Sequence, residues 1–127
     1  MFLEVDVTEK KFPSVEGGEF VALSGLKFSV SKGQFTCLVG PSGTGKTTLL
    51  NILSGLDTKY QGSVSIDGKT PKAALPLGYM FQSPRLMPWL TVLENVSIVA
   101  NEEARSEGRP EKLLEEMDLG DFMQTYP

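Results

Sequence analysis

Two segments near the amino-terminus alternate apolar and polar residues, as strands with one buried face do. They are FLEVDV at residues 2–7 and FVALSGLKFSV at residues 20–30, and the turn-forming PSVEGGE lies between them. The pattern predicts two short strands joined by a turn. A third alternating segment, GSVSIDG at residues 62–68, predicts another strand followed by a turn.

Two other segments are apolar with little or no alternation of polar residues. FTCLV at residues 35–39 follows a predicted tight turn, SKGQ at residues 31–34, and is apolar almost throughout. Such a run is typical of a strand covered on both faces, as in a parallel sheet. LGYMF at residues 77–81 is a further candidate strand.

Helical patterns follow these strands. After GPSGTGKTT (residues 40–48), apolar residues recur at helical spacing, with a glycine near the expected helix end. Thr91 with Glu94 three residues later predicts a capping box and a helix over roughly residues 92–103. Pro110 predicts the start of a last helix that runs to about Leu119, with Gly120 at its end. The apolar positions of the first helix are Leu49, Ile52, Leu53 and Leu56, and its glycine is Gly55.

Length and charge narrow the class of protein. The chain has 127 residues, of which 40% are hydrophobic and 22% charged, which suits a single globular domain with a modest core. Its formal net charge of −4 argues against a nucleic-acid partner. The acidic stretch at residues 102–121 is interpreted as the solvated face of helices.

The cysteine and histidine counts exclude some chemistry. A single cysteine, Cys37, and no histidine exclude an internal disulfide and a cysteine-based zinc site. We expect Cys37 to be a small core residue of the strand at 35–39. The first residues lack the layout of a secretion signal, and no apolar run reaches the roughly 18–20 residues that span a bilayer. We therefore expect a soluble intracellular protein, and any link to a membrane would have to run through a partner.

Residues 40–47 carry the strongest chemical signal. GPSGTGKT matches the phosphate-loop pattern G-x-x-x-x-G-K-[ST], between an apolar run and an amphipathic helix. Glycines let consecutive backbone N–H groups approach one phosphate, and the following helix directs its positive end at the same anion. Lys46 can add a positive charge at the β- and γ-phosphates, and Thr47 offers a hydroxyl ligand for Mg²⁺. The sequence therefore predicts nucleotide-phosphate binding.

The pattern leaves the class of phosphate-loop protein open. A GTP-binding switch would need D-x-x-G and N-K-x-D, and neither string occurs. A kinase for small molecules is not excluded by this test, because its lid residues are less stereotyped. The decision therefore depends on the rest of the chain.

Residues 20–68 and residues 78–96 (GYMFQSPRLMPWLTVLENV) together resemble the ATP-binding subunit of an ATP-binding cassette (ABC) transporter. PRLMPWLTV is most similar to bacterial importers of nitrate, sulfonates and taurine, and the resemblance covers the amino-terminal half of a cassette. It implies an α/β fold of the P-loop NTPase type, with an incomplete RecA-like parallel sheet, an antiparallel β subdomain and the start of a helical subdomain.

The resemblance divides the single domain, residues 1–127, into three parts. Residues 1–33 and 58–70 correspond to the antiparallel subdomain, and residues 34–57 and 71–84 to the P-loop core. Residues 85–127 correspond to the start of the helical subdomain.

The resemblance also implies roles for individual residues. Gln82 matches the Q-loop glutamine, which ligates Mg²⁺ and assists catalysis together with Lys46, although Ser83 stands where many relatives carry an acid. Phe12 matches the aromatic residue that stacks on adenine; Phe20 is a rival, and a buried strand aromatic is the alternative. The implied ATP and Mg²⁺ site comprises Phe12, Gly40, Ser42, Gly43, Thr44, Gly45, Lys46, Thr47, Thr48 and Gln82.

The implied partners are a membrane permease and a second ATP-binding subunit. Residues 85–90 fall where the family docks a short helix of the permease, and Trp89 with its apolar neighbours suits such a contact. Equally, Trp89 could pack under the following helix. The implied location is the cytoplasmic face of a bacterial cell membrane, as a peripheral protein.

Three elements of the family's hydrolytic machinery do not occur in the chain. These are the LSGGQ signature, the Walker B strand with its catalytic glutamate, and a switch histidine. We expect ATPase activity in a full-length form, and weak hydrolysis together with self-association from the 127 residues alone. The alternatives are another P-loop ATPase or kinase, and a nucleotide-binding module without turnover.

Overall fold

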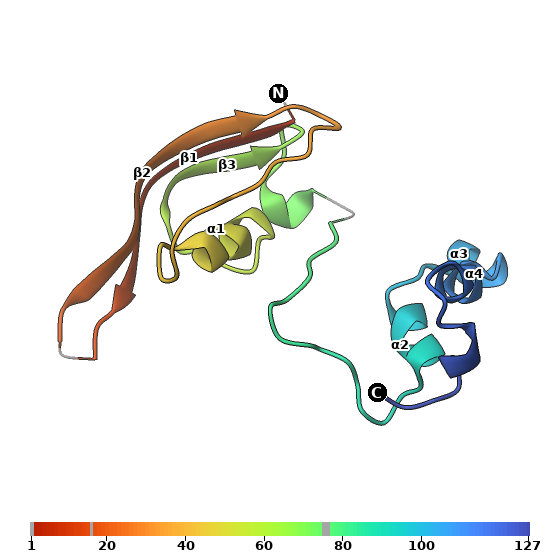
Figure 1. Ribbon diagram of the computed structural model, residues 1–127. Helices are drawn as coiled ribbons and strands as arrows, with labels where there is room; N and C mark the ends of the chain where they lie inside the picture. The colour runs from red at the N-terminus through yellow and green to blue at the C-terminus, as the bar shows by residue number, and fades with distance from the viewer. Residues whose placement is uncertain (1, 16, 75–76) are drawn as a thin grey trace. The chain divides into compact units, whose positions relative to one another are not determined.

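Strands form most of the first part of the chain, and short helices the second. The computed structural model describes residues 2–15, 17–74 and 77–127, which divide into two units, Met1–Tyr79 and Met80–Pro127. The first contains β1 (Leu3–Pro13), β2 (Glu19–Val30), α1 (Lys46–Leu53), β3 (Gln61–Ile66) and the 3₁₀ turn η1 (Pro71–Ala73) (Figure 1). The second contains α2 (Val92–Ile98), α3 (Glu102–Ser106), α4 (Arg109–Glu116) and the 3₁₀ turn η2 (Gly120–Phe122).

The three strands make one antiparallel sheet in the order β2-β1-β3. Val5 of β1 lies opposite Phe28 of β2 and Val64 of β3. Because directly opposite residues in a sheet share a face, these apolar side chains line the same side. The strands predicted from the alternating segments are confirmed, including the turn after residue 30, where Gln34 N donates to Ser31 O at 3.2 Å.

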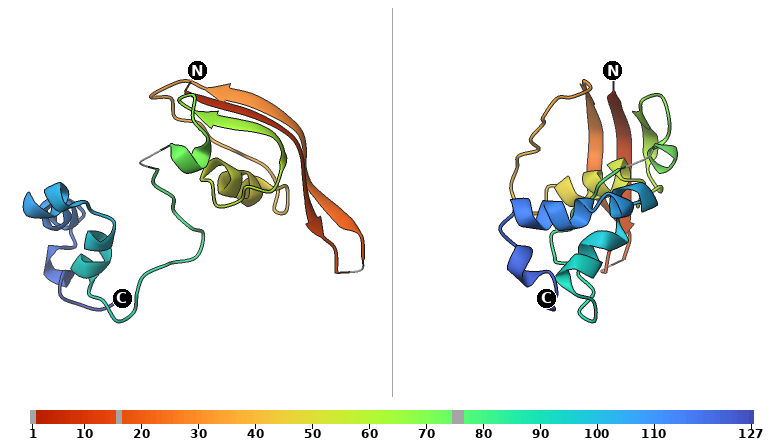
Figure 2. Two further views of the ribbon diagram at one scale, coloured as in Figure 1. Left: turned by 180° about the vertical axis from the view of Figure 1, so that it is seen from behind. Right: turned by 90° about the vertical axis from the view of Figure 1, so that its right-hand side faces the viewer.

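Helix α1 covers that apolar side of the sheet (Figures 1 and 2). Leu49 and Ile52 of α1 are buried in one cluster with Val5, Val7 and Val64. Burying a Leu or Ile side chain stabilises the fold by about 1.5–3 kcal/mol. The predicted amphipathic helix is therefore confirmed, and its packing fixes the start of α1 against the strands.

The sheet contains two register shifts. One places an extra residue in β1, between Val7 and Glu9, against β3. The other places an extra residue in β2, opposite the step from Lys10 to Lys11. Along β1, burial passes from the odd residues Val5 and Val7 to Lys10. A bulge adds one unpaired residue and so changes which side chains point inward. The sequence pattern did not predict that a lysine would occupy a buried position here.

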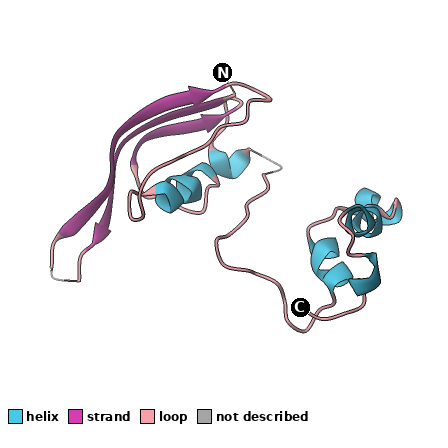
Figure 3. Cartoon of the chain, viewed as in Figure 1, coloured by secondary structure: helices cyan, strands magenta, loops and turns pink. Residues whose placement is uncertain are grey.

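The strand predicted at residues 35–39 is wrong. This segment forms no strand and is drawn as a loop (Figure 3). Phe35 and Val39 are each 90% exposed, and Cys37 is exposed. A strand of this kind needs flanking strands as hydrogen-bond partners. Among the described residues, no strand pairs with this segment. The candidate strand at 77–81 is also irregular. No parallel pairing therefore occurs within the described part of the chain.

In the second unit, the predicted capping box is confirmed at α2. Glu94 N donates to Thr91 Oγ1 at 3.2 Å, and Thr91 N donates to Glu94 Oε2 at 2.7 Å. The helix ends at Ile98, however, so the single helix predicted over residues 92–103 is wrong. The reason is a second cap: Asn101 Oδ1 accepts from Ala104 N at 2.8 Å and starts α3.

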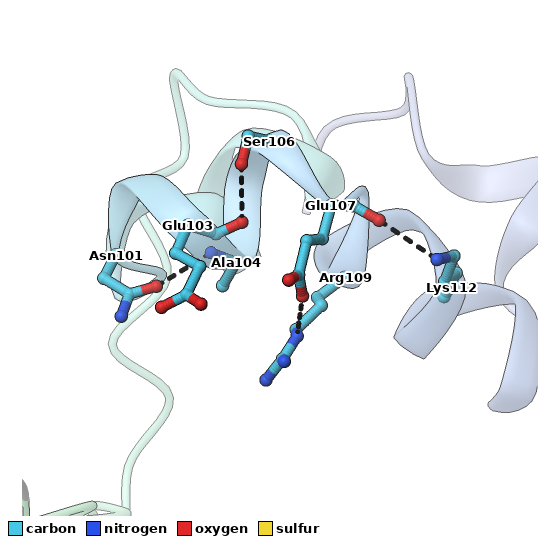
Figure 4. Close-up of polar contacts among 7 residues, drawn as sticks. All are labelled: Asn101, Glu103, Ala104, Ser106, Glu107, Arg109 and Lys112. Carbon is cyan, nitrogen blue, oxygen red and sulfur yellow. Dashed lines mark hydrogen bonds and ion pairs between the residues drawn. The ribbon is translucent and has the colours of Figure 1, made fainter.

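Helix α4 begins close to Pro110, as predicted, but ends at Glu116 instead of near residue 119. Contacts around Glu107 join α3 to α4 (Figure 4). The Glu107 carboxylate pairs with Arg109 Nε at 2.6 Å, and its carbonyl oxygen accepts from Lys112 Nζ at 3.0 Å. Most acidic side chains between residues 102 and 121 are exposed, which confirms that this stretch is a solvated helical face.

Candidate functional site

The glycine-rich loop lies directly before α1 and is shaped by left-handed backbone conformations. Gly43 has φ +80° and Gly45, the residue that precedes the helix, has φ +83°. Glycine adopts this region without the steric cost that a Cβ imposes. The loop therefore turns sharply into the first turn of α1.

Gly45 also lies tightly against strand β2. A Cβ atom there would be 2.6 Å from the carbonyl oxygen of Ala22 and 2.6 Å from Leu23 Cδ2. Conformation and space thus both require glycine at this position. The contact fixes the end of the loop against the middle of the β1–β2 hairpin.

The Lys46 ammonium group is held by the loop itself. Its Nζ donates to the carbonyl oxygens of Gly40, at 2.7 Å, and Pro41. The same Nζ lies 3.3 Å from Thr44 Oγ1, and that hydroxyl donates to Pro41 O at 2.9 Å. The carbonyl groups therefore hold the Lys46 ammonium against the loop. Because these groups are exposed, the ammonium could exchange them for a bound anion.

The start of α1 has the electrostatic properties of an anion site. The first N–H groups of a helix have no acceptor within it, and Gly45 has no side chain with which to cap them. The first turn carries no acidic residue, so the positive end of the helix dipole is not neutralised locally. Thr47 is exposed and Thr48 half-buried in this turn, and Thr47 offers a hard oxygen of the kind that Mg²⁺ prefers.

The structure thus brings most of the predicted site residues together in one loop and one helical turn. These residues are Gly40, Ser42, Gly43, Thr44, Gly45, Lys46, Thr47 and Thr48. The roles of these residues toward a nucleotide remain predictions.

Phe12 lies near the end of β1, directly opposite Phe20 of β2. Phe12 is 37% exposed and Phe20 is also exposed, so Phe12 is not the buried strand aromatic of the alternative interpretation. Both rings remain candidates for stacking on a flat ligand.

Lys10 is a neighbour of this site that sequence reasoning missed. Its side chain is only 4% exposed, and its Nζ lies 2.7 Å from Asp57 Oδ2 and donates to Lys59 O at 2.7 Å. The same Nζ lies over the Phe12 ring, 4.4 Å from its centroid. The bulge between Val7 and Glu9 accompanies the inward position of this lysine. The glycine at position 62, which lies opposite Val7 and has φ +116°, was a signal of irregular pairing in the sequence.

Asp57 has a perturbed acidity because of this contact. Burial raises the pKa of its carboxyl, but hydrogen bonds from Lys10 Nζ and from the Lys59 backbone outweigh burial, and the net pKa is lowered from 3.8. Asp57 is therefore held ionised. The ion pair joins β1 to the segment that follows α1.

Gln82 belongs to the second unit and is exposed, whereas the glycine-rich loop belongs to the first. The metal-binding and catalytic roles of Gln82 remain predictions. Close to it, the Arg85 guanidinium lies over the Phe81 ring, 4.9 Å from the centroid.

Residues 86–90 form an exposed apolar loop in the second unit. Trp89 is 70% exposed, and Leu86 and Met87 are also exposed, which favours a surface patch over packing beneath α2. Asn95 orders the loop: its Nδ2 donates to Met87 O at 3.1 Å and Leu90 O at 3.0 Å, and its Oδ1 accepts from Met87 N at 2.7 Å. Sequence analysis did not identify this asparagine.

None of the helices in the described residues has both the length and the apolar character needed to cross a bilayer. Nor do those residues gather three or more His, Cys, Asp or Glu side chains in a group that could hold a metal ion.

Comparison with known families gives a match to the ABC transporter family, whose model covers residues 23–127. This range includes the whole glycine-rich loop, α1 and the helical unit.

Two curated relatives carry the same kind of name. The chain is 37% identical over 129 residues to the aliphatic sulfonates import ATP-binding protein SsuB of Bacillus subtilis, with 100% of this chain and 50% of that protein covered. It is 39% identical over 112 residues to the nitrate import ATP-binding protein NrtC of Synechocystis sp., with 87% and 17% covered. The chain thus spans half the length of the first relative and less of the second.

Two solved structures share the fold. One is a dimeric ATP-binding cassette in a post-hydrolysis state bound to ADP and Pi, with TM-score 0.80 and 28% identity, covering 98% of this chain and 61% of that one. The other is a dimeric bacterial ABC transporter cassette, with TM-score 0.77, 27% identity and the same coverage. These likenesses confirm the expected α/β fold class.

Proposed function

Because the chain belongs to the ABC transporter family, we propose that it is the nucleotide-binding part of an ATP-binding subunit that drives solute import. The observation that carries the proposal is the loop at residues 40–47, in which the Lys46 ammonium is held by the carbonyl oxygens of Gly40 and Pro41. That loop opens onto the positive end of α1. A polyphosphate is the ligand that this combination of amides, helix end and ammonium suits best.

We assign the phosphates to the loop and the first turn of α1. The loop amides bind the phosphate oxygens, with Ser42 and Thr48 as additional hydroxyl donors, and Lys46 leaves its carbonyl partners to bind the β- and γ-phosphates. Thr47 would hold Mg²⁺ together with Gln82. The bound metal supplies charge neutralisation at the phosphates.

The base would stack on an aromatic ring of the β1–β2 hairpin. Phe12 is the preferred residue, and its exposed surface at the end of β1 supports this assignment. Stacking of a base on an aromatic side chain contributes about 1–3 kcal/mol in nucleic-acid systems and tolerates any base. ATP is therefore selected mainly through its phosphates.

The partners would be a membrane permease and a second copy of the subunit. The apolar loop at residues 86–90, with Trp89 exposed, supports a permease contact, since exposed apolar patches mark interaction surfaces. The names of the relatives, import ATP-binding proteins for sulfonates and nitrate, support import of a small anionic solute. We place the complex at the cytoplasmic face of a bacterial membrane.

ATP hydrolysis is proposed for the full-length protein. Phosphoryl transfer depends on a metal ion, a positioned water and a carboxylate base acting together. Among the described residues, Thr47 and Gln82 are the candidates for holding the metal, and Lys46 is the candidate for binding the phosphates. The family match over residues 23–127 argues against the kinase for small molecules considered above.

Calorimetric titration with Mg·ATP tests the proposal. We expect saturable binding to the 127-residue chain, and loss of at least about tenfold in affinity for Lys46→Ala, since one phosphate contact of a charged group contributes about 1.5–3 kcal/mol. Lys32→Ala, which removes an exposed lysine of the turn before the loop, is the matched control. Equal affinities for the wild type and Lys46→Ala would contradict the proposal.

A further inference from the structure

We propose that Lys10 is a positioning residue for the nucleotide base, holding the Phe12 ring so that a base stacks on the face that Lys10 leaves free. The inference rests on the proposed function, since it presumes that a nucleotide binds at the glycine-rich loop. It extends that function by assigning a role to a buried charge that phosphate binding does not use.

The first step is the environment of Lys10. A lysine that is 4% exposed needs compensation for the lost hydration of its charge, and Lys10 receives it from the Asp57 carboxylate and the Lys59 carbonyl, each at 2.7 Å. Two such contacts from one short segment fix the position of Nζ. The ammonium is therefore an anchored charge and not a mobile surface group.

The second step is the contact with Phe12. The anchored Nζ lies 4.4 Å from the centroid of the Phe12 ring, well inside the range of a cation–π interaction. Lys10 and Phe12 are two residues apart on β1, so their side chains leave the strand on the same side. With the ammonium over one face, the ring is restrained and only its other face can receive a base.

The third step is the place of this pair relative to the glycine-rich loop. Gly45 lies against Ala22 and Leu23, and Leu23 is the residue opposite Lys10 in the sheet. Phe12 lies opposite Phe20, three residues from Leu23 along β2, which is roughly 10 Å at the usual rise of a strand. Phe12 is therefore displaced from the loop along the hairpin. In a nucleotide the base is likewise displaced from the phosphates, so a nucleotide with its phosphates at the loop could direct its base toward Phe12.

The test compares ATP with inorganic tripolyphosphate, which has no base. Both ligands are titrated with Mg²⁺ into the full 127-residue chain and into Lys10→Gln, which keeps a donor for the Lys59 carbonyl but lacks the charge. We expect Lys10→Gln to bind ATP about fivefold more weakly and tripolyphosphate equally well. Lys10→Arg, which retains charge and ring stacking, should restore ATP affinity.

Two controls separate positioning from a merely structural role. Lys27→Gln removes a charge of the same kind from the exposed Lys27–Asp6 pair between β2 and β1 and should leave both affinities unchanged. In a Phe12→Ala background, Lys10→Gln should cause no further loss of ATP affinity, because the ring through which Lys10 acts is absent.

Three outcomes would overturn the inference. If Lys10→Gln lowers the affinities for ATP and tripolyphosphate alike, Lys10 stabilises the fold and does not position the base. If it weakens neither, the contact with Phe12 has no role in binding. If the wild type binds both ligands but binds ATP no more tightly, no base stacks here, whereas a wild type that binds neither contradicts the proposed function itself.

Discussion

Gly45 and Ala22 approach each other so closely that a Cβ on the glycine would lie 2.6 Å from the alanine carbonyl oxygen. The end of the glycine-rich loop is thereby held against strand β2, at the point where the chain enters α1. Gly45 is thus required for packing as well as for its left-handed φ of +83°.

Gly45→Ala is therefore expected to weaken both folding and ligand binding. An alanine in the left-handed region costs about 1–2 kcal/mol, and the overlap with β2 adds further strain. Urea unfolding should show a loss of at least about 2 kcal/mol, and titration should show weaker Mg·ATP binding. Gly78→Ala, at a position where a Cβ meets no atom within 4 Å, is the matched control and should change neither.

The ion pair of Lys10 and Asp57 predicts a defined pH dependence. The pKa of Asp57 is lowered in the folded state from 3.8, so the unfolded state binds more protons at acidic pH. The pair therefore stabilises the fold fully above about pH 4, and this contribution is lost as pH falls through the lowered pKa.

Asp57→Asn tests this prediction. At neutral pH, it should reduce the free energy of unfolding by about 1.5–3 kcal/mol, the usual range for a hydrogen bond to a charged group. The difference from wild type should shrink as the pH is lowered below 4. Asp67→Asn, at an exposed turn position with φ +50° that asparagine tolerates, is the control; an unchanged pH profile for Asp57→Asn would contradict the assignment.

The role of Thr47 as a metal ligand predicts that its effect on ATP binding depends on Mg²⁺. If its hydroxyl is a Mg²⁺ ligand, Thr47→Ala will weaken binding of Mg·ATP by about tenfold and will leave the affinity for ATP in excess EDTA unchanged. Thr36→Ala, in the exposed segment before the loop, should affect neither measurement. Equal losses with and without metal would show instead that Thr47 contacts the phosphates directly.

Asn95 should control the order of the apolar loop at residues 86–90. Its side chain holds Met87 and Leu90 by hydrogen bonds of 2.7–3.1 Å, and Asn95→Ala removes these bonds. Trp89 is the single tryptophan of the chain, and its fluorescence anisotropy reports on this loop alone.

We expect the Trp89 anisotropy to fall in Asn95→Ala while α2 remains folded, as its capping box at Thr91 is intact. Ile98→Ala, which removes an exposed side chain from the same helix, should leave the anisotropy unchanged. A similar fall in both variants would mean that Asn95 has no special role.

Features that depend on local chemistry were predictable from the sequence. The glycines and Lys46 of the loop, the alternation of apolar and polar residues in the strands, and the Thr91–Glu94 capping box are each patterns contained within a short stretch of the sequence. Sequence alone therefore located the glycine-rich loop and the start of α2.

Features that depend on distant partners were not predictable. The run at residues 35–39 has the composition of a buried strand, yet it is exposed because no strand of the described residues pairs with it. The burial of Lys10 follows from a bulge and from Asp57, 47 residues away along the chain. The break between α2 and α3 depended on Asn101 starting a new helix, where the apolar pattern alone favoured continuation.

The central claim is that residues 40–48 bind a polyphosphate through their backbone amides. Amide chemical shifts in ¹H–¹⁵N spectra of the full 127-residue chain, followed while Mg·ATP is added, test this directly and residue by residue. We predict the largest shifts at Gly43, Gly45, Lys46 and Thr47, and their absence in Lys46→Ala at the same concentrations. Saturation of binding with unperturbed amides throughout residues 40–48 would contradict the claim.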